Sequence, residues 1–192
     1  MTEAYIVATA RSPIGRAYKG SLREMRADDL AAQMVRAALD KVPALDPDRI
    51  DDLILGCGLP GGEQGMNMGR IVAVLLGLDG VPGTTVTRYC SSSVQSTRMA
   101  FHAIKAGEGD VFVSAGAESV SRMVKGSSDY IEGQDLENPR FAGATERTAK
   151  RAVGEAPVWT DPRADGELPD AYIAMGQTAE NLASVHGISR AE

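Results

Sequence analysis

Apolar and polar positions follow two alternating periods along the first 120 residues. Short apolar runs bounded by turn residues predict buried strands at 4–10, 51–57, 83–89 and 110–116. Between these runs, apolar residues recur every three or four positions, which predicts helices over 26–42, 67–78 and about 90–107. Apolar strands that alternate with helices indicate a sheet covered on both faces. The pattern therefore predicts a layered α/β/α fold.

The regular pattern stops near residue 121. Residues 125–169 are rich in Gly, Pro, Asp and Arg, and this composition predicts a long irregular segment, either a functional loop or a disordered stretch. A helix is predicted again over 170–187, where Gly187 is suited to a C-cap. Ser189 and Glu192 then have the spacing of a capping box, which starts a helix. We therefore expect the natural chain to continue beyond Glu192.

Composition and charge narrow the class of protein. The chain has 192 residues, of which 43% are hydrophobic, and no apolar stretch approaches the ~18 residues of a membrane span. The N-terminus carries an acidic residue where a signal peptide carries positive charge, so we expect a cytoplasmic protein without a membrane partner. The net charge of −6 and the scattered Lys and Arg residues disfavour nucleic-acid binding. Cys57 and Cys90 form no CxxC pair, so neither a metal site nor a disulfide is expected.

Cys90 stands at a predicted junction between strand and helix, in the segment TRYCSSSVQS (87–96). If the helix begins at Cys90 or one residue later, the thiol lies beside free backbone N–H groups and the positive end of the helix dipole. Such a position stabilises a thiolate or a nearby oxyanion, and the three serines after it leave room for a substrate. Free cysteines also occur as small buried packing residues, so position alone leaves both interpretations open.

A cysteine nucleophile needs a base, and the chain has two histidines. His102 lies three turns further along the same predicted helix, roughly 18 Å from Cys90, and cannot form a catalytic pair with it. His186 falls at a predicted helix end, where histidines commonly meet the last carbonyl groups. Local patterns therefore predict a thiolate and leave its base unidentified.

Several segments resemble, in order, the motifs of the thiolases, also called acetyl-CoA acyltransferases. They are TARSPIGRAYKGSL (9–22), Asn67 with Arg70 as Asn-x-x-Arg, TRYCSSSVQS around Cys90, GAESVSR (116–122) and MGQTAEN (175–181). The resemblance covers nearly the whole chain and is weakest over 125–169. It implies that residues 1–121 form the family's N-terminal α/β domain. Residues 122–192 would then be part of the loop domain that covers the active site, truncated at its C-terminal end.

The resemblance also implies a chemistry and its participants. Cys90 matches the family nucleophile, which attacks a 3-ketoacyl-CoA and holds the acyl group as a thioester until a second coenzyme A accepts it. The reverse reaction condenses two acyl-CoA molecules. Met175 matches a methionine that lines the acyl pocket, although a methionine on an apolar helix face is also ordinary core. The family uses coenzyme A as a substrate, binds no permanent cofactor, and assembles as homodimers or homotetramers.

Basic residues in the covering region are candidates for contact with the phosphates of coenzyme A, although a solvated surface is the simpler interpretation for each. They are Arg140, Arg147, Lys150, Arg151 and Arg163.

This sequence departs from the family pattern in two respects. Ser93 stands where family members usually carry glycine, which predicts a different local backbone or acyl pocket. The family's histidine in Gly-His-Pro, asparagine in Asn-Glu-Ala-Phe and second cysteine in Cys-x-Gly are not among these 192 residues. Without that base and proton donor, we expect the isolated chain to be a poor enzyme that needs a missing C-terminal half.

Three other functions remain open at this stage. A β-ketoacyl synthase-like condensing enzyme shares the Cys-Ser-Ser-Ser turn, although the other segments favour a thiolase. Residues 56–61 formally fit the dinucleotide motif GxGxxG, but Pro60 and the glycines after it keep a helix from opening there. Cys57 within that segment is better interpreted as a packing residue. A truncated, non-catalytic thiolase homologue is the third alternative.

Overall fold

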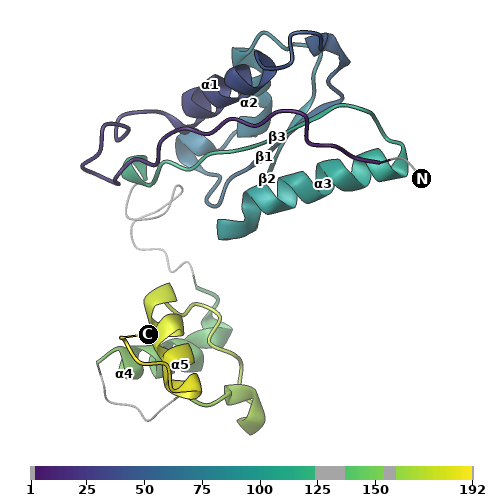
Figure 1. Ribbon diagram of the computed structural model, residues 1–192. Coiled ribbons are helices and arrows are strands. Elements are labelled where there is room, and N and C mark those ends of the chain that lie inside the picture. Colours follow the sequence, from purple (N-terminus) through teal and green to yellow (C-terminus); the bar gives the residue numbers. More distant parts are fainter. Residues whose placement is uncertain (1–2, 124–136, 154–158, 192) are drawn as a thin grey trace. The chain divides into compact units, whose positions relative to one another are not determined.

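The computed structural model describes residues 3–123, 137–153 and 159–191 and divides the chain into two compact units. The first is Met1–Ile131 and the second is Glu132–Glu192 (Figure 1). The boundary between these units lies ten residues after the position, near residue 121, that the sequence motifs predict. Among the described residues, no helix is long and apolar enough to cross a membrane.

The first unit is built on a parallel sheet of three strands in the order β2-β1-β3. The strands are β1 (Asp52–Gly56), β2 (Gly83–Val86) and β3 (Phe112–Gly116). Their register pairs Gly56 with Val86 on one side and with Gly116 on the other. All three strands therefore end side by side at one carboxyl edge, and the loops that follow them meet there.

Helices cover both faces of this sheet, as the sequence pattern predicts (Figure 1). On one face lie α1 (Ala27–Leu39) and α2 (Met68–Leu75), and on the other lies α3 (Ser92–Ala106). Helix α3 ends at Gly107, whose positive φ of 79° is the left-handed conformation common at helix C-termini.

The face under α1 and α2 holds the main hydrophobic core. Leu53, Leu55 and Cys57 alternate toward it along β1 and its continuation, and Met68 and Val72 of α2 pack against them. These residues are almost completely buried. Burial of large aliphatic side chains on this face supplies the main hydrophobic stabilisation of the unit.

The face under α3 is made of smaller and more polar residues. Ser96 is fully buried, and its Oγ lies 2.9 Å from Oγ of Ser114 on β3. Thr97 Oγ1 also lies 2.9 Å from Ser114 Oγ, and both Ser96 and Thr97 donate to the carbonyl of Ser93. The buried hydroxyl of Ser96 is thus paired with another hydroxyl and with a backbone carbonyl, which lets a polar group lie between helix and sheet.

The prediction of a strand over residues 4–10 is wrong. The described chain provides no strand that pairs with it, and Tyr5, Ile6 and Val7 are each more than three-quarters exposed. A local contact ties this segment down, since Lys41 Nζ donates to the carbonyl of Thr9 at 2.6 Å. An apolar run specifies that a segment favours burial, but a strand also needs a partner, which the run cannot specify.

Other boundaries differ from the sequence pattern in detail. Strand β2 ends at Val86, three residues before the predicted end, because the chain turns there into the segment that carries Cys90. The range 125–169, predicted to be irregular, contains the helix α4 (Ala142–Ala152). The predicted capping box at 189–192 includes Glu192, which lies outside the described residues.

The second unit pairs α4 with α5 (Met175–His186) around a buried carboxylate. Asp170 accepts hydrogen bonds from Arg147 Nη2 at 2.9 Å, Arg151 Nη1 at 3.2 Å and Trp159 Nε1 at 3.1 Å. Gln177 of α5 donates to the carbonyl of Thr148 in α4 at 2.8 Å. Charged and polar contacts therefore hold this unit together, and Gly187 ends α5 in the left-handed conformation, as the sequence predicts.

Candidate active site

The carboxyl edge of the sheet gathers three loops from distant parts of the sequence. They follow β1 at residues 57–61, β2 at 87–90 and β3 at 117–119. In open α/β sheets, ligands commonly bind at this edge because it is where loops converge and helices begin. Cys90 lies in the second of these loops.

Cys90 is exposed and lies in a short 3₁₀ turn, Tyr89–Ser91, directly before α3. Tyr89 has a φ of 45°, which is unusual for a bulky residue and makes the chain turn sharply. The buried hydroxyl of Ser92 secures this turn: its Oγ accepts from the N–H of Arg88 at 2.9 Å and donates to the carbonyl of Tyr89 at 2.5 Å. The thiol of Cys90 therefore lies in an exposed turn that the buried hydroxyl of Ser92 holds in place.

The helix start differs from the sequence expectation. Helix α3 begins at Ser92, two residues after Cys90, and the 3₁₀ turn extends its N-terminus. The N–H of Ser91 bonds to the carbonyl of Arg88, and that of Ser92 bonds to the carbonyl of Tyr89. Two N–H groups that the sequence analysis left free are therefore used within the turn, because a 3₁₀ turn satisfies donors that an abrupt helix start leaves open.

Two glycines allow α3 to begin this close to the sheet. A Cβ on Gly56 would lie 2.5–2.7 Å from backbone atoms of Ser92 and Ser93, and a Cβ on Gly116 would clash with Oγ of Ser93. Ser93, the residue that departs from the family pattern, sits within α3 and places its hydroxyl over Gly116. The extra side chain is accommodated because the facing position lacks one.

Cys57 is confirmed as a packing residue. It is 1% exposed, and burial, followed by the nearby Glu118 carboxylate, raises the pKa of its thiol to about 12. The glycine-rich segment around it leads into a 3₁₀ turn, Gly62–Gln64, and α2 begins only at Met68. The segment therefore lacks the strand-to-helix junction that a dinucleotide site needs.

The other candidate residues occupy separate places. His102 lies on α3, exposed, with its ring edge-on to Phe101 at a centroid distance of 5.5 Å. Met175 and His186 are the first and last residues of α5 in the second unit, and Met175 is 77% exposed. Cys90 and Met175 belong to different units, so the role of Met175 in an acyl pocket stays a prediction.

Two of the motif residues have clear structural roles. Asn67 precedes α2 with a φ of 53°, and its Nδ2 donates to the carbonyl of Gly83 at 2.8 Å. The guanidinium of Arg70 donates to the carbonyls of Val81 at 2.5 Å and Asp79 at 3.0 Å. Together they fasten α2 to the turn that leads into β2.

The GAESVSR segment after β3 is anchored by charge. Arg122 forms an ion pair with Glu63, whose other oxygen also binds Arg26 Nη1 at 3.0 Å. The hydrogen bond from Arg122 lowers the pKa of Glu63 below its usual value. Tyr18 N–H donates to Ser121 Oγ at 2.9 Å, so the segments around residues 18 and 121, which carry two of the motifs, meet in space.

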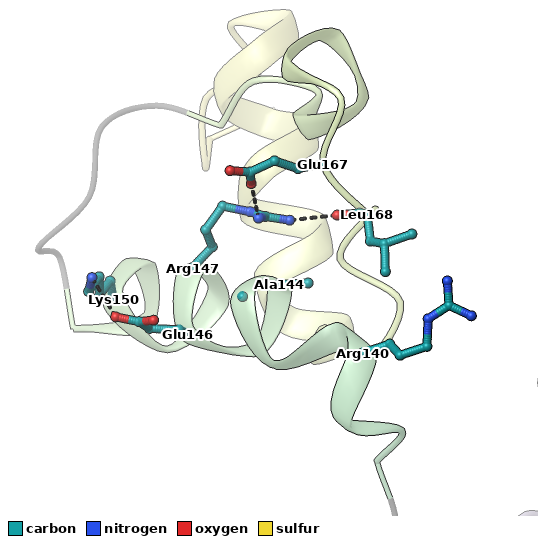
Figure 2. Close-up of a pocket in the computed structure, with 8 residues that line it drawn as sticks. Arg140, Ala144, Glu146, Arg147, Lys150, Glu167 and Leu168 are labelled. Atoms are coloured by element: carbon teal, nitrogen blue, oxygen red, sulfur yellow. Dashed lines mark hydrogen bonds and ion pairs between the residues drawn. The ribbon is translucent and has the colours of Figure 1, made fainter.

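The basic residues of the second unit are mostly paired with carboxylates. Lys150 binds Glu146 at 2.8 Å, and Arg163 binds Asp161 at 2.8 Å. Arg147 and Arg151 both bind Asp170. A pocket of about 420 Å³ lies along α4, and Figure 2 shows Arg147 directed to Glu167 and to the carbonyl of Leu168.

Arg140 differs from these four basic residues. Its side chain extends away from the other labelled side chains in Figure 2, and within the described residues it has no carboxylate partner. Of the five basic candidates, Arg140 is therefore the one for which no ion pair is found within residues 3–123, 137–153 and 159–191.

Residues 4–192 match the family described as "Thiolase, N-terminal domain". The chain belongs to the thiolase family. Within the first unit, the motif around Cys90 lies at the carboxyl edge of the sheet, and the motifs 9–22 and 116–122 meet through Tyr18 and Ser121. The layered α/β fold is that of the family, as the sequence predicts.

Relatives and a solved structure agree with this assignment. The chain is 38% identical to the 3-ketoacyl-CoA thiolase of Bacillus subtilis, over 99% of this chain and 41% of that protein. It is 47% identical to the 3-oxoadipyl-CoA/3-oxo-5,6-dehydrosuberyl-CoA thiolase of Escherichia coli, over 99% of this chain and 44% of that protein. The crystal structure of the Bacillus anthracis acetyl-CoA acetyltransferase matches with a TM-score of 0.69 and 28% identity, over 99% of this chain and 43% of that one. The chain thus spans less than half the length of these thiolases.

Sequence reasoning singled out Cys90 as a candidate but missed the residues that fix its surroundings. Ser92, Gly56 and Gly116 control the turn and the approach of α3, and Glu118 and Gln64 link two of the loops. One signal was available, because Gly56 and Gly116 each end an apolar run. A glycine at the end of a strand often marks close approach of another backbone segment.

Proposed function

We propose that this chain supplies the nucleophile of a thiolase and that Cys90 accepts the acyl group. The thiolate of Cys90 attacks the 3-carbonyl carbon of a 3-ketoacyl-CoA. The bond between carbons 2 and 3 then breaks, and its electron pair leaves with acetyl-CoA, which takes up a proton. The thiol of a second coenzyme A then attacks the thioester on Cys90. The acyl group passes to coenzyme A, and Cys90 leaves as a thiolate that takes up the proton of the coenzyme A thiol. Read in reverse, the same steps condense two acyl-CoA molecules.

The observation that carries this proposal is the placement of Cys90. It is exposed, lies at the carboxyl edge of the sheet, and follows a sharp turn held by Ser92 at the start of α3. Cys57, in contrast, is buried and its raised pKa keeps it as an unreactive thiol. The chain thus presents one thiol for chemistry and uses the other for packing.

The substrate class follows from what the named relatives share. The B. subtilis and E. coli proteins are named for 3-ketoacyl-CoA and 3-oxoadipyl-CoA, which have the same 3-ketoacyl thioester unit. We therefore propose acyl-CoA and coenzyme A as partners, with no permanently bound cofactor. In this proposal residues 1–121 form the N-terminal domain, 122–192 belong to the region that covers the active site, and Met175 lines the acyl pocket.

Full turnover requires groups beyond Cys90. The family motifs that supply a histidine base and a second cysteine are not in this sequence, so we propose that a C-terminal half provides them. We also propose a cytoplasmic homodimer or homotetramer. The exposed apolar side chains of Tyr5, Ile6 and Val7 support association, because their burial against another chain or segment would be favourable.

Incubation with acetyl-CoA, followed by intact mass under denaturing conditions and peptide mapping, tests the proposal. We expect slow transfer of one acetyl group to Cys90 without turnover. Cys90→Ser should abolish the adduct and Cys57→Ser should retain it. Absence of an adduct on Cys90 would favour a non-catalytic homologue, whereas transfer from an acyl carrier protein but not from acetyl-CoA would favour a β-ketoacyl synthase-like enzyme.

A further inference from the structure

Glu118 forms a bridge across the carboxyl edge that reaches the turn carrying Cys90. It follows β3, and its Oε2 accepts the N–H of Gly58, in the loop after the central strand β1, at 2.5 Å. The carbonyl of the same Gly58 accepts the hydroxyl of Thr87, in the loop after β2, at 2.8 Å. One residue of the central loop is therefore held from both sides, by Glu118 and by the segment that leads to Cys90.

Gly58 also lies close to the nucleophile turn. A Cβ added to Gly58 would lie 2.7 Å from Glu118 Oε2 and 3.5 Å from the backbone carbonyl group of Tyr89, the second at ordinary contact distance. Tyr89 is the residue with positive φ that precedes Cys90. A conformation of this kind persists when its surroundings hold it in place, and Gly58 is one of those surroundings.

The chemistry of the contacts requires a carboxylate at position 118. Its Oε1 accepts Gln64 Nε2 at 2.8 Å and lies 3.7 Å from the thiol of Cys57, while Oε2 accepts the N–H of Gly58. Donors thus converge on both oxygens, and an ionised carboxylate is an acceptor at both. A glutamine there would turn its NH₂ group toward one of these donors and lose that contact.

The surrounding loops are also linked independently of Glu118. Buried Gln64 donates to the carbonyl of Leu59 at 3.1 Å, and its Oε1 accepts the N–H of Ser119 at 2.6 Å. The loops after β1 and β3 therefore remain connected when Glu118 changes. Removal of the Glu118 charge should consequently displace Gly58 and the turn that carries Cys90, while the fold stays intact.

We propose that Glu118 is a positioning residue for Cys90: it holds Gly58 against Thr87 and Tyr89 and so fixes the turn that presents the thiol. The inference rests on the proposed role of Cys90 as the reactive thiol. Its test uses no acyl-CoA, so that it can fail separately from the proposed function.

The test is the rate at which iodoacetamide alkylates Cys90 in the native protein, resolved from Cys57 by peptide mapping. Cys57 is buried, so its labelling reports opening of the fold and serves as an internal monitor. In Glu118→Gln we expect the Cys90 rate to fall roughly fivefold, the scale of one lost hydrogen bond, with Cys57 unlabelled. Glu108→Gln, which removes the same charge from the exposed turn after α3, should leave both rates unchanged.

A change of charge near the thiol is distinguished from a change of position by a second reagent. Loss of a negative charge would favour anionic iodoacetate over neutral iodoacetamide, whereas a displaced turn slows both reagents equally. Thr87→Val, which releases Gly58 from the other side, should slow Cys90 in the same way. Because both changes act through Gly58, the double variant should be slowed little beyond either single one.

Three results would overturn the inference. The first is a Cys90 rate in Glu118→Gln that equals that of the unsubstituted protein while Cys57 stays protected. The second is labelling of Cys57 together with Cys90, which would make Glu118 a residue of general stability. The third is a change only in the ratio of iodoacetate to iodoacetamide rates, which would make its effect electrostatic.

Discussion

The two faces of the sheet in the first unit are built from different materials. Under α1 and α2, large aliphatic side chains such as Leu53 and Val72 are almost completely buried. Under α3, Ile54 and Ala100 are buried beside glycines and hydroxyls, with Ser96 fully buried and paired to Ser114. The comparison indicates that the two faces have different roles. The apolar face supplies stability, and the small, polar face brings α3 close enough to set the position of Cys90.

The largest expected effect is on the apolar face. Leu53 is fully buried, so Leu53→Ala should lower the free energy of unfolding by about 2–5 kcal/mol, through lost burial and the cavity left behind. Leu75→Ala, at a half-exposed position of α2, is the matched control and should cost far less. Denaturant unfolding measures both. Equal losses for the two variants would contradict the assignment of the core to this face.

A smaller loss of stability, with a specific effect on the site, is expected at Gly56. Gly56→Ala places a Cβ against backbone atoms of Ser92 and Ser93, so the start of α3 must shift, at a cost of about 1–3 kcal/mol. Gly80→Ala is the control, because no described atom lies within 4 Å of its Cβ position. Native alkylation of Cys90 should change in the first variant only. A Gly56→Ala protein with unchanged Cys90 reactivity would show that the close approach does not position the thiol.

The smallest effect concerns pH and the buried thiol of the apolar face. Burial raises the pKa of the Cys57 thiol to about 12 in the folded protein, whereas in the unfolded chain the thiol has its ordinary, lower pKa. At a pH between these two pKa values, unfolding therefore releases the thiol proton. The free energy of unfolding should therefore fall by about 1 kcal/mol between pH 8 and pH 10. Cys57→Ala should lack this component of the decline. An identical pH dependence in the two proteins would contradict the account of Cys57.

The sequence predicted most of the first unit because its pattern is local. The helices over 27–39 and 92–106 and three of the strands follow from periodicity and apolar runs. The segment 4–10 fails because pairing depends on a distant partner, which no local run encodes. Helix α4 was missed because Gly143 and a weak apolar period obscured it, and the buried carboxylate of Asp170 that holds its arginines lies 19 residues or more away along the chain.

The candidate site also has one part that the local sequence encodes and another part that depends on contacts between distant segments. The place of Cys90 between a strand and a helix was predictable because both elements are encoded within about ten consecutive residues, and its catalytic role stays a prediction. The bridge from Glu118 through Gly58 to Thr87 joins three loops, and only the parallel register of the strands brings them together. The helix start was predicted at Cys90 or one residue later and begins at Ser92, because a 3₁₀ turn and a single non-glycine residue with positive φ precede it.

The central claim is that stability and the position of Cys90 are separable, and a matched pair of variants tests it most directly. Ser92→Ala removes the hydroxyl that holds the Tyr89 turn, and Val72→Ala trims the apolar core; each should cost about 1–3 kcal/mol. The measurement is the native alkylation rate of Cys90 in both, beside their free energies of unfolding. We predict that only Ser92→Ala changes the Cys90 rate. Rates that simply follow stability in both variants would contradict the account.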